Sequence, residues 1–173
     1  MIKKLSILIL LPVLYFSTGF AQEKSKKQIK EERKIEKQNQ VEAMINAKVF
    51  VFTARTALPQ GYKTVNLNTN MYNVSFSPEI INSYLPYYGR AYSGMSYGND
   101  TGLKFEGKPE EFSVTKGKKN FNVKAVVKGE NDVFDLSLSI SFEGSASLTV
   151  NSNNRSPISY NGEISAPEKP AVP

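Results

Sequence analysis

The sequence predicts an all-β domain: an antiparallel meander of about eight strands that forms a small barrel or sandwich, preceded by a charged N-terminal helix. Two observations predict this fold. Apolar and polar residues alternate along most of the chain after residue 48, and short polar segments that contain glycine separate the alternating runs, as hairpin turns do. Hydrophobic residues make up 40% of the 173 residues, which is enough for one buried core.

Residues 1–21 have the three parts of a secretory signal peptide. Lys3 and Lys4 form a basic start, Leu5 to Phe16 form an apolar run, and Gly19-Phe20-Ala21 forms a small-residue cleavage site. The apolar run is too short to span a hydrocarbon layer of about 30 Å. We therefore expect cleavage after Ala21 and a mature protein that is periplasmic or secreted and does not span a membrane.

The mature chain is expected to begin with a charged helical spacer over residues 22–40. This stretch contains no proline or glycine, and Glu31 and Lys34 stand at a spacing that favours a helical ion pair. Its isoleucines do not share one helix face. Only Val41, Met44 and Ile45 form an apolar patch, so we expect the last turns to dock onto an all-β domain that covers residues 41–165.

The clearest strand is expected at residues 134–142, where Phe134, Leu136, Leu138, Ile140 and Phe142 alternate with one aspartate and three serines. The other expected strands are 49–54, 62–67, 71–76, 103–106, 112–115, 121–127, 146–150 and 158–164. Residues 166–173 contain three prolines and are expected to form a frayed tail.

Cysteine and histidine, on which most familiar hydrolase mechanisms depend, are absent from the chain. Without cysteine there is no disulfide, no thiol nucleophile and no lipid-modified N-terminal cysteine; without histidine there is no Ser-His triad. Paired carboxylates remain possible, but Asp135 and Glu143 fall at solvent-facing or turn positions, and Asp100 lies in a turn-like segment. We therefore expect no catalytic residue, no metal site and no cofactor.

The positive charge of the chain does not predict a nucleic-acid partner. The formal net charge is +6, and removal of Lys3 and Lys4 with the signal peptide lowers it by two. Much of the remaining charge lies in the N-terminal spacer, where lysine and glutamate are mixed. Basic residues also cluster between Lys116 and Lys128 around one expected hairpin, but beyond it the polar strand faces carry serine and asparagine.

A tyrosine-rich segment interrupts the alternating pattern, since six of the nine tyrosines lie between Tyr72 and Tyr97. The candidate ligand-binding residues are Tyr84, Tyr87, Tyr88, Arg90 and Tyr92. Tyrosine offers a rigid ring with one hydroxyl, and arginine offers a planar set of donors. Two interpretations stay open: a loop that lies over a ligand cleft, or a plug that closes one end of the sheet, in which Arg90 stacks on a tyrosine or bonds to carbonyls.

The same segment carries a resemblance. Leu85-Pro86-Tyr87-Tyr88-Gly89-Arg90-Ala91-Tyr92 resembles the signature of an uncharacterised bacterial family, domain of unknown function 4251. Further agreeing pieces are Phe50 to Phe52 with Pro59 and Gly61, Gly102 to Phe105, Leu148 to Val150 with Arg155, and Ile158 to Gly162. The resemblance covers roughly residues 43–164. It implies a secreted or envelope protein, and it implies no activity and no site residue.

These observations predict a non-enzymatic binding module for a small ligand, a glycan or a lipid. The alternative is a structural or protein-interaction component of the cell envelope, in which the N-terminal helix contacts a partner. The sequence leaves the oligomeric state open.

Overall fold

A computed structural model describes residues 25–68, 71–92, 102–130 and 132–167 of the chain. The expected signal peptide, residues 93–101 with Tyr97 and Asp100, and the end of the proline-rich tail lie outside these residues. The described part contains one helix and ten strands, which confirms an all-β fold preceded by a charged helix. Within it, no helix has both the length and the apolar character needed to cross a membrane.

The helix precedes all of the strands along the chain. The elements are α1 (Lys26–Ala47), β1 (Phe50–Pro59), β2 (Val65–Asn66), β3 (Asn73–Phe76), β4 (Ile81–Leu85), β5 (Leu103–Gly107), β6 (Pro109–Lys116), β7 (Asn120–Lys128), β8 (Val133–Ser141), β9 (Ser145–Ser152) and β10 (Ile158–Ser165).

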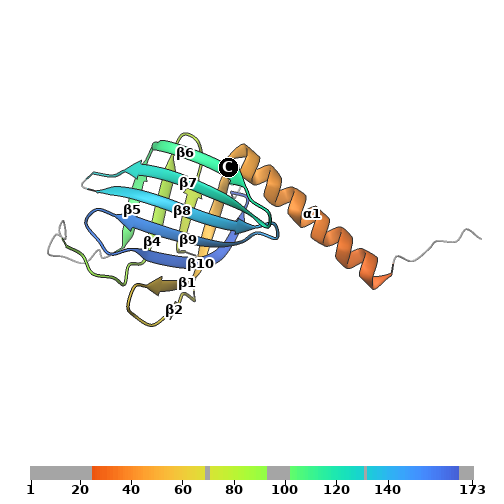
Figure 1. Ribbon diagram of the computed structural model, residues 1–173, viewed down its shortest axis with the longest axis horizontal. Coiled ribbons are helices and arrows are strands. Elements are labelled where there is room, and N and C mark those ends of the chain that lie inside the picture. The colour runs from red at the N-terminus through yellow and green to blue at the C-terminus, as the bar shows by residue number, and fades with distance from the viewer. Residues whose placement is uncertain (1–24, 69–70, 93–101, 131, 168–173) are drawn as a thin grey trace, which may run out of the picture. The chain divides into compact units, whose positions relative to one another are not determined.

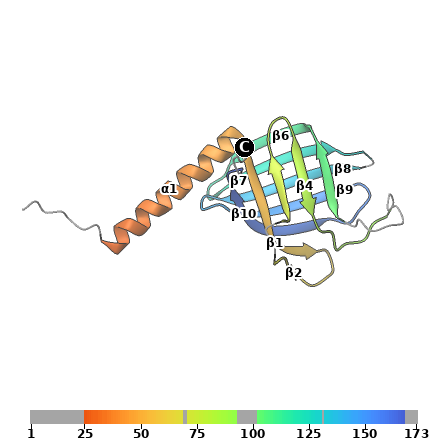
Figure 2. The same ribbon diagram turned by 180° about the vertical axis from the view of Figure 1, so that it is seen from behind.

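The strands form one antiparallel sheet in the order β5-β4-β3-β1-β10-β9-β8-β7-β6, with β2 attached to β1. Strands β6 to β10 cross β1 and β3 to β5 at a steep angle in both ribbon views (Figures 1 and 2). The nine-stranded sheet therefore curves into a nearly closed barrel, with β5 and β6 as its two edges. Of the two expected architectures, the protein adopts the barrel.

The alternating residues line the inside of this barrel. In β7 and β8, Val123 stands opposite Leu138, and both side chains are almost completely buried. Phe105 of β5 stacks on Phe134 of β8 with ring centroids 4.0 Å apart, so side chains from distant strands meet in the interior. The largest fully buried side chains are those of Tyr160, Phe50, Phe52, Phe76, Ile45, Ile81, Leu85, Leu103, Leu136, Leu138, Ile140 and Leu148.

Strands β1 and β10 approach each other unusually closely at Gly162. The β1–β10 register shifts between Ala54 and Thr56, which marks a β-bulge in β1. A Cβ atom on Gly162 would lie 2.0 Å from the carbonyl oxygen of Thr53. Only glycine fits at this position without a shift of the backbone.

The last turns of α1 dock onto the barrel as expected. Val41 and Ile45 are buried, and a Cβ on Gly144 of the β8–β9 turn would lie 3.3 Å from a methyl group of Val41. The Glu42 carboxylate forms an ion pair with the Lys116 ammonium at the end of β6, with 2.6 Å between Oε1 and Nζ. At the start of the helix, Ser25 and Gln28 exchange the two hydrogen bonds of a capping box.

Strand β4 was not expected, because its inward-facing positions are not all apolar. Ile81, Ser83 and Leu85 face the interior, and the serine interrupts the hydrophobic alternation. The Ser83 hydroxyl is satisfied by a 2.9 Å hydrogen bond to the Leu103 carbonyl of β5. The expected strand at 62–67 shortens to the two residues of β2.

Candidate ligand-binding site

Residues 86–92 close one end of the barrel. The Tyr160 side chain fills the interior beneath them, and its hydroxyl donates a 2.7 Å hydrogen bond to the Pro86 carbonyl. Ala91 forms a β-bridge with Arg155, and the Tyr92 amide donates to the Asn154 carbonyl at 2.7 Å. The segment is therefore held by the loop between β9 and β10.

Tyr87 and Gly89 form the inner part of this closure. The buried Tyr87 hydroxyl lies 2.8 Å from the Arg90 carbonyl, 3.0 Å from the Ser156 carbonyl and 2.9 Å from the Ser156 hydroxyl. A Cβ on Gly89 would lie 2.3 Å from that Tyr87 hydroxyl. Gly89 thus leaves the space that the tyrosine occupies, and this pair has the structural role of a plug.

The arginine that supports the plug is Arg155. Its guanidinium lies 5.2 Å from the centre of the Tyr87 ring, and its Nη1 donates to the Gly102 carbonyl at 2.9 Å. We expected Arg90 to make these contacts if the segment were a plug. Arg155 makes these contacts instead, whereas the Arg90 side chain is exposed and lines a surface pocket.

The Tyr160 hydroxyl remains a hydrogen-bond donor in this closure. Burial of the phenol, followed by its proximity to Tyr87 and Tyr88, raises the pKa of Tyr160 far above its ordinary value. The side chain is therefore neutral at physiological pH and keeps the proton that it donates to Pro86.

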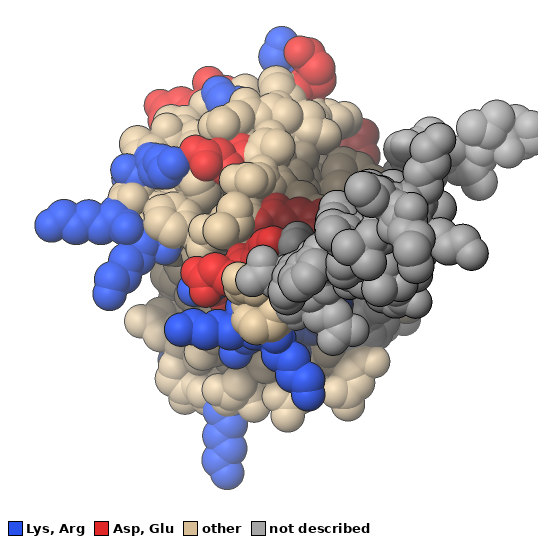
Figure 3. Space-filling view, turned by 90° about the vertical axis from the view of Figure 1, so that its right-hand side faces the viewer, with Lys and Arg blue, Asp and Glu red and all other residues tan. Residues whose placement is uncertain are grey.

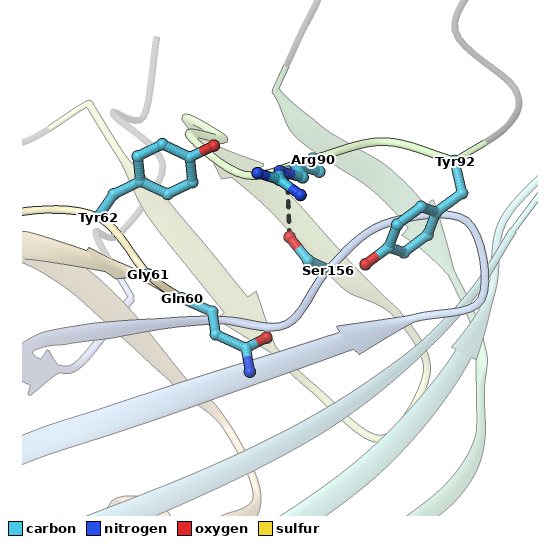
Figure 4. Close-up of a pocket in the computed structure, with 6 residues that line it drawn as sticks. All are labelled: Gln60, Gly61, Tyr62, Arg90, Tyr92 and Ser156. Atoms are coloured by element: carbon cyan, nitrogen blue, oxygen red, sulfur yellow. Dashed lines mark hydrogen bonds between the residues drawn. The ribbon is translucent and has the colours of Figure 1, made fainter.

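The backbone of Arg90 is fixed within the closed end, whereas its side chain is exposed. The Arg90 amide donates to the Ser156 hydroxyl at 3.1 Å, and the Arg90 carbonyl accepts from the Ser156 amide at 2.9 Å as well as from Tyr87. The guanidinium lies in a pocket of about 380 Å³. The pocket is lined by Gln60, Gly61, Tyr62, Arg90, Tyr92 and Ser156 (Figure 4).

Two exposed tyrosines flank the guanidinium. Tyr62 and Tyr92 lie on opposite sides of Arg90 and Ser156, and the Tyr62 hydroxyl points toward the Arg90 side chain (Figure 4). A hydrogen bond with Tyr62, followed by charge interaction with the same phenol, raises the pKa of Arg90. Tyr62 is 56% exposed and Tyr92 is 70% exposed, so both remain accessible to a ligand.

The structure separates the five candidate residues. Arg90 and Tyr92 line the pocket and Tyr87 lies inside, while Tyr84 is on the outer surface. There Tyr84 stacks on Tyr72 with centroids 6.0 Å apart, and Lys104 lies 4.7 Å over its ring.

Tyr88 belongs with this outer group. Its side chain is 40% exposed, and its pKa is raised by partial burial and then by Tyr72.

Four lining residues were not predicted as binding residues from the sequence: Gln60, Gly61, Tyr62 and Ser156. Gln60 and Tyr62 belong to the turn after β1. The run Pro59-Gln60-Gly61 is typical of a turn, and it is the feature of the sequence that could have drawn attention to them. Ser156 had no local signal, because its role depends on contacts with Tyr87 and Arg90, which are more than sixty residues away in the chain.

The described carboxylates do not form a metal site. Asp132 accepts hydrogen bonds from the Val133 amide, the Asn153 amide and the Ser152 hydroxyl, so it organises the loops around it. Among the residues that the structure describes, no three His, Cys, Asp or Glu side chains come together as a metal site would require. On the face drawn in Figure 3, acidic side chains lie between the basic ones, and uncharged surface separates them.

These features define a nearly closed antiparallel barrel whose one end is sealed by a tyrosine-containing segment. The family model described as "Domain of unknown function (DUF4251)" matches residues 32–164, and the chain belongs to this family. The match includes the plug, Ser156 and every residue of the pocket. No curated protein matches the sequence.

A solved structure shows the same fold. The crystal structure of a DUF4251 family protein from Bacteroides eggerthii DSM 20697 matches with a TM-score of 0.59 and 17% sequence identity. The match covers 75% of this chain and 87% of that chain. At this identity the likeness extends to the fold alone.

Proposed function

We propose that this protein is an exported, non-enzymatic binding module that takes a small anionic ligand at the Arg90 pocket. The observation that carries the proposal is the division within residues 86–92. Tyr87 and Gly89 are used to close the barrel, whereas the adjacent Arg90 has a fixed backbone and an exposed side chain between two exposed tyrosines.

The chemistry of the lining residues supports a carboxylate or phosphate group on the ligand. A guanidinium presents parallel N–H donors that match two oxygens of such a group. Tyr62 and Tyr92 add flat apolar surface and hydroxyls, which suit a sugar ring or another compact polar body. The pocket volume of about 380 Å³ falls within the range of small-molecule sites.

Binding without catalysis is supported by the side chains near the pocket. Among the residues that the structure describes, the six that line the pocket include no carboxylate, and the chain has no histidine or cysteine that could act as a base or nucleophile. Export is supported by residues 1–21, whose basic start, apolar run and small-residue end are typical of a cleavable signal peptide.

One observation favours the rival function, an interaction protein of the cell envelope. Nearly all side chains of α1 before Val41 are exposed, including Ile29 and Ile35 at 38% and 50%. Exposed apolar side chains on a helix can bind a partner protein. In that function α1 is the recognition element, and the Arg90 pocket is not needed.

Native mass spectrometry of residues 22–173 tests the proposal, with the protein exported to a bacterial periplasm and purified without unfolding. The added probes are glucuronate, glucose 6-phosphate and neutral glucose. We expect an adduct with at least one of the two anionic probes, little or none with glucose, and loss of the adduct in Arg90→Gln. The matched control Arg55→Gln, which changes an exposed arginine paired with Glu163, should bind as the wild type does.

The two anionic probes separate carboxylate from phosphate recognition. Failure of the wild-type protein to bind either anion, or equal binding by Arg90→Gln, would overturn the proposal. A bound protein partner that is lost when residues 22–39 are deleted would support the rival function instead.

A further inference from the structure

The edge strand β6 has backbone groups that β7 does not use. Among the described strands it pairs with β7 alone, at one end of the strand order. The Gly117 amide donates to the Asn120 carbonyl in the β6–β7 turn, which sets the alternation of the ladder. Thr115 and Ser113 therefore direct their backbone groups toward β7, whereas Lys116, Val114 and Phe112 direct theirs toward the open edge.

Lys48 covers part of this edge. Its ammonium donates a 3.0 Å hydrogen bond to the outward Phe112 carbonyl and lies 5.2 Å over the Phe112 ring. Long cationic side chains on an edge strand are one way in which proteins prevent pairing with another chain. Pro109, at the start of β6, lacks an amide hydrogen and is a second such feature.

The backbone at Lys48 indicates that this side chain matters. Lys48 has φ +57° in the left-handed region, where glycine is favoured. The Lys48 amide bonds to the Ile45 carbonyl and the Val49 amide to the Met44 carbonyl, which together form the Schellman motif that ends α1. Glycine would adopt this backbone conformation with less strain than lysine does. The chain nevertheless has a lysine here, and its side chain reaches the Phe112 carbonyl of β6.

The side chains along the β6 edge are complementary to those of a second β6 strand that runs antiparallel to it. If two β6 strands pair antiparallel about Ser113, Glu110 stands opposite Lys116 and Phe112 opposite Val114. Phe112, Val114 and Lys116 direct their backbone groups outward, so the hydrogen-bonding pattern and the Phe112–Val114 pair agree. Glu110 lies where the β6–β7 register shifts, between Pro109 and Glu111, and it contributes its charge to the pairing. Lys116 is already paired with Glu42 within one chain, so Glu110 of a second copy would share that ammonium.

We infer that the β6 edge is a self-pairing surface for a second copy of this chain, and that the Lys48 side chain keeps it closed. The occupant is a second β6 strand, because the opposite-charge pairs and the Phe112–Val114 pairs occur twice in the symmetric pairing. With Lys48 in place, the Phe112 carbonyl is occupied and the chain stays monomeric.

Sedimentation velocity over a concentration series tests this inference. Lys48→Gly accepts the φ of +57° without strain and removes the cap, so we expect a folded protein that shifts from monomer to dimer mass as concentration rises. Wild type and Lys48→Arg, which keeps a long cationic side chain, should remain monomeric at every concentration.

A second substitution shows whether β6 is the surface that pairs. In the Lys48→Gly background, Val114→Pro removes an amide that points to the open edge and leaves the bonds to β7 intact. Circular dichroism checks that this variant is folded, and it should return to monomer mass. A wild-type dimer, a monomeric Lys48→Gly, or a Lys48→Gly dimer that a folded Val114→Pro variant retains would each overturn the inference.

Discussion

Gly162→Ala is expected to lower the free energy of unfolding by more than about 3 kcal/mol, because the new methyl group overlaps backbone and cannot be accommodated by a rotamer change. The added Cβ would lie 2.0 Å from the Thr53 carbonyl oxygen and 3.1 Å from the Ala54 Cα. Strands β1 and β10 would have to separate at the bulge. Urea unfolding followed by circular dichroism measures the loss.

The neighbouring residue provides the control for this substitution. Asn161 is exposed in the same strand, and Asn161→Ala should change the free energy of unfolding by no more than about 0.5 kcal/mol. A Gly162→Ala protein as stable as Asn161→Ala would show that β1 and β10 do not approach this closely.

Gly89→Ala is expected to destabilise the protein by about 3 kcal/mol, because it forces out the Tyr87 hydroxyl and its hydrogen bonds. The new Cβ would lie 2.3 Å from that hydroxyl and 2.6 Å from the Ser156 hydroxyl. The atoms that must move are the ends of side chains, so the closed end can rearrange without separating the strands. The loss should therefore be smaller than that for Gly162→Ala in the same urea experiment.

Gly61 provides the contrast. It has φ +79°, and no atom of the described residues lies within 4 Å of an added Cβ. Gly61→Ala should cost only the backbone strain, about 1 kcal/mol. If Gly61→Ala were as costly as Gly89→Ala, the effect at residue 89 would not be evidence for a filled space.

Much of the fold follows from local patterns in the sequence. The alternation of Phe134, Leu136, Leu138 and Ile140 predicts β8, because side chains on one face of a strand share one environment. The patch of Val41 and Ile45 likewise predicts where α1 docks. These features depend on residues close in sequence, so periodicity was sufficient to find them.

Other features depend on contacts between distant residues. Strand β4 is invisible to a hydrophobic pattern because Ser83 faces inward and is satisfied by Leu103 in another strand. The closed end depends on Ser156, whose partners Tyr87 and Arg90 are far away in the chain. From the sequence, residues 86–92 were expected to be either a plug or part of a ligand site. In the structure Tyr87 of this segment is buried in the plug, whereas Arg90 is exposed in the pocket.

Tyr87 and Arg90 face opposite ways at the closed end of the barrel, and paired urea unfolding of Tyr87→Phe and Arg90→Gln tests these orientations directly. Tyr87→Phe removes a buried hydroxyl whose single proton lies near the Arg90 and Ser156 carbonyls and which also contacts the Ser156 hydroxyl, so it should lower the free energy of unfolding by about 1–3 kcal/mol. Arg90→Gln changes an exposed side chain and keeps the backbone bonds to Ser156, so its effect should stay within about 0.5 kcal/mol. An Arg90→Gln protein destabilised as much as Tyr87→Phe would contradict the account, because Arg90 would then be part of the plug.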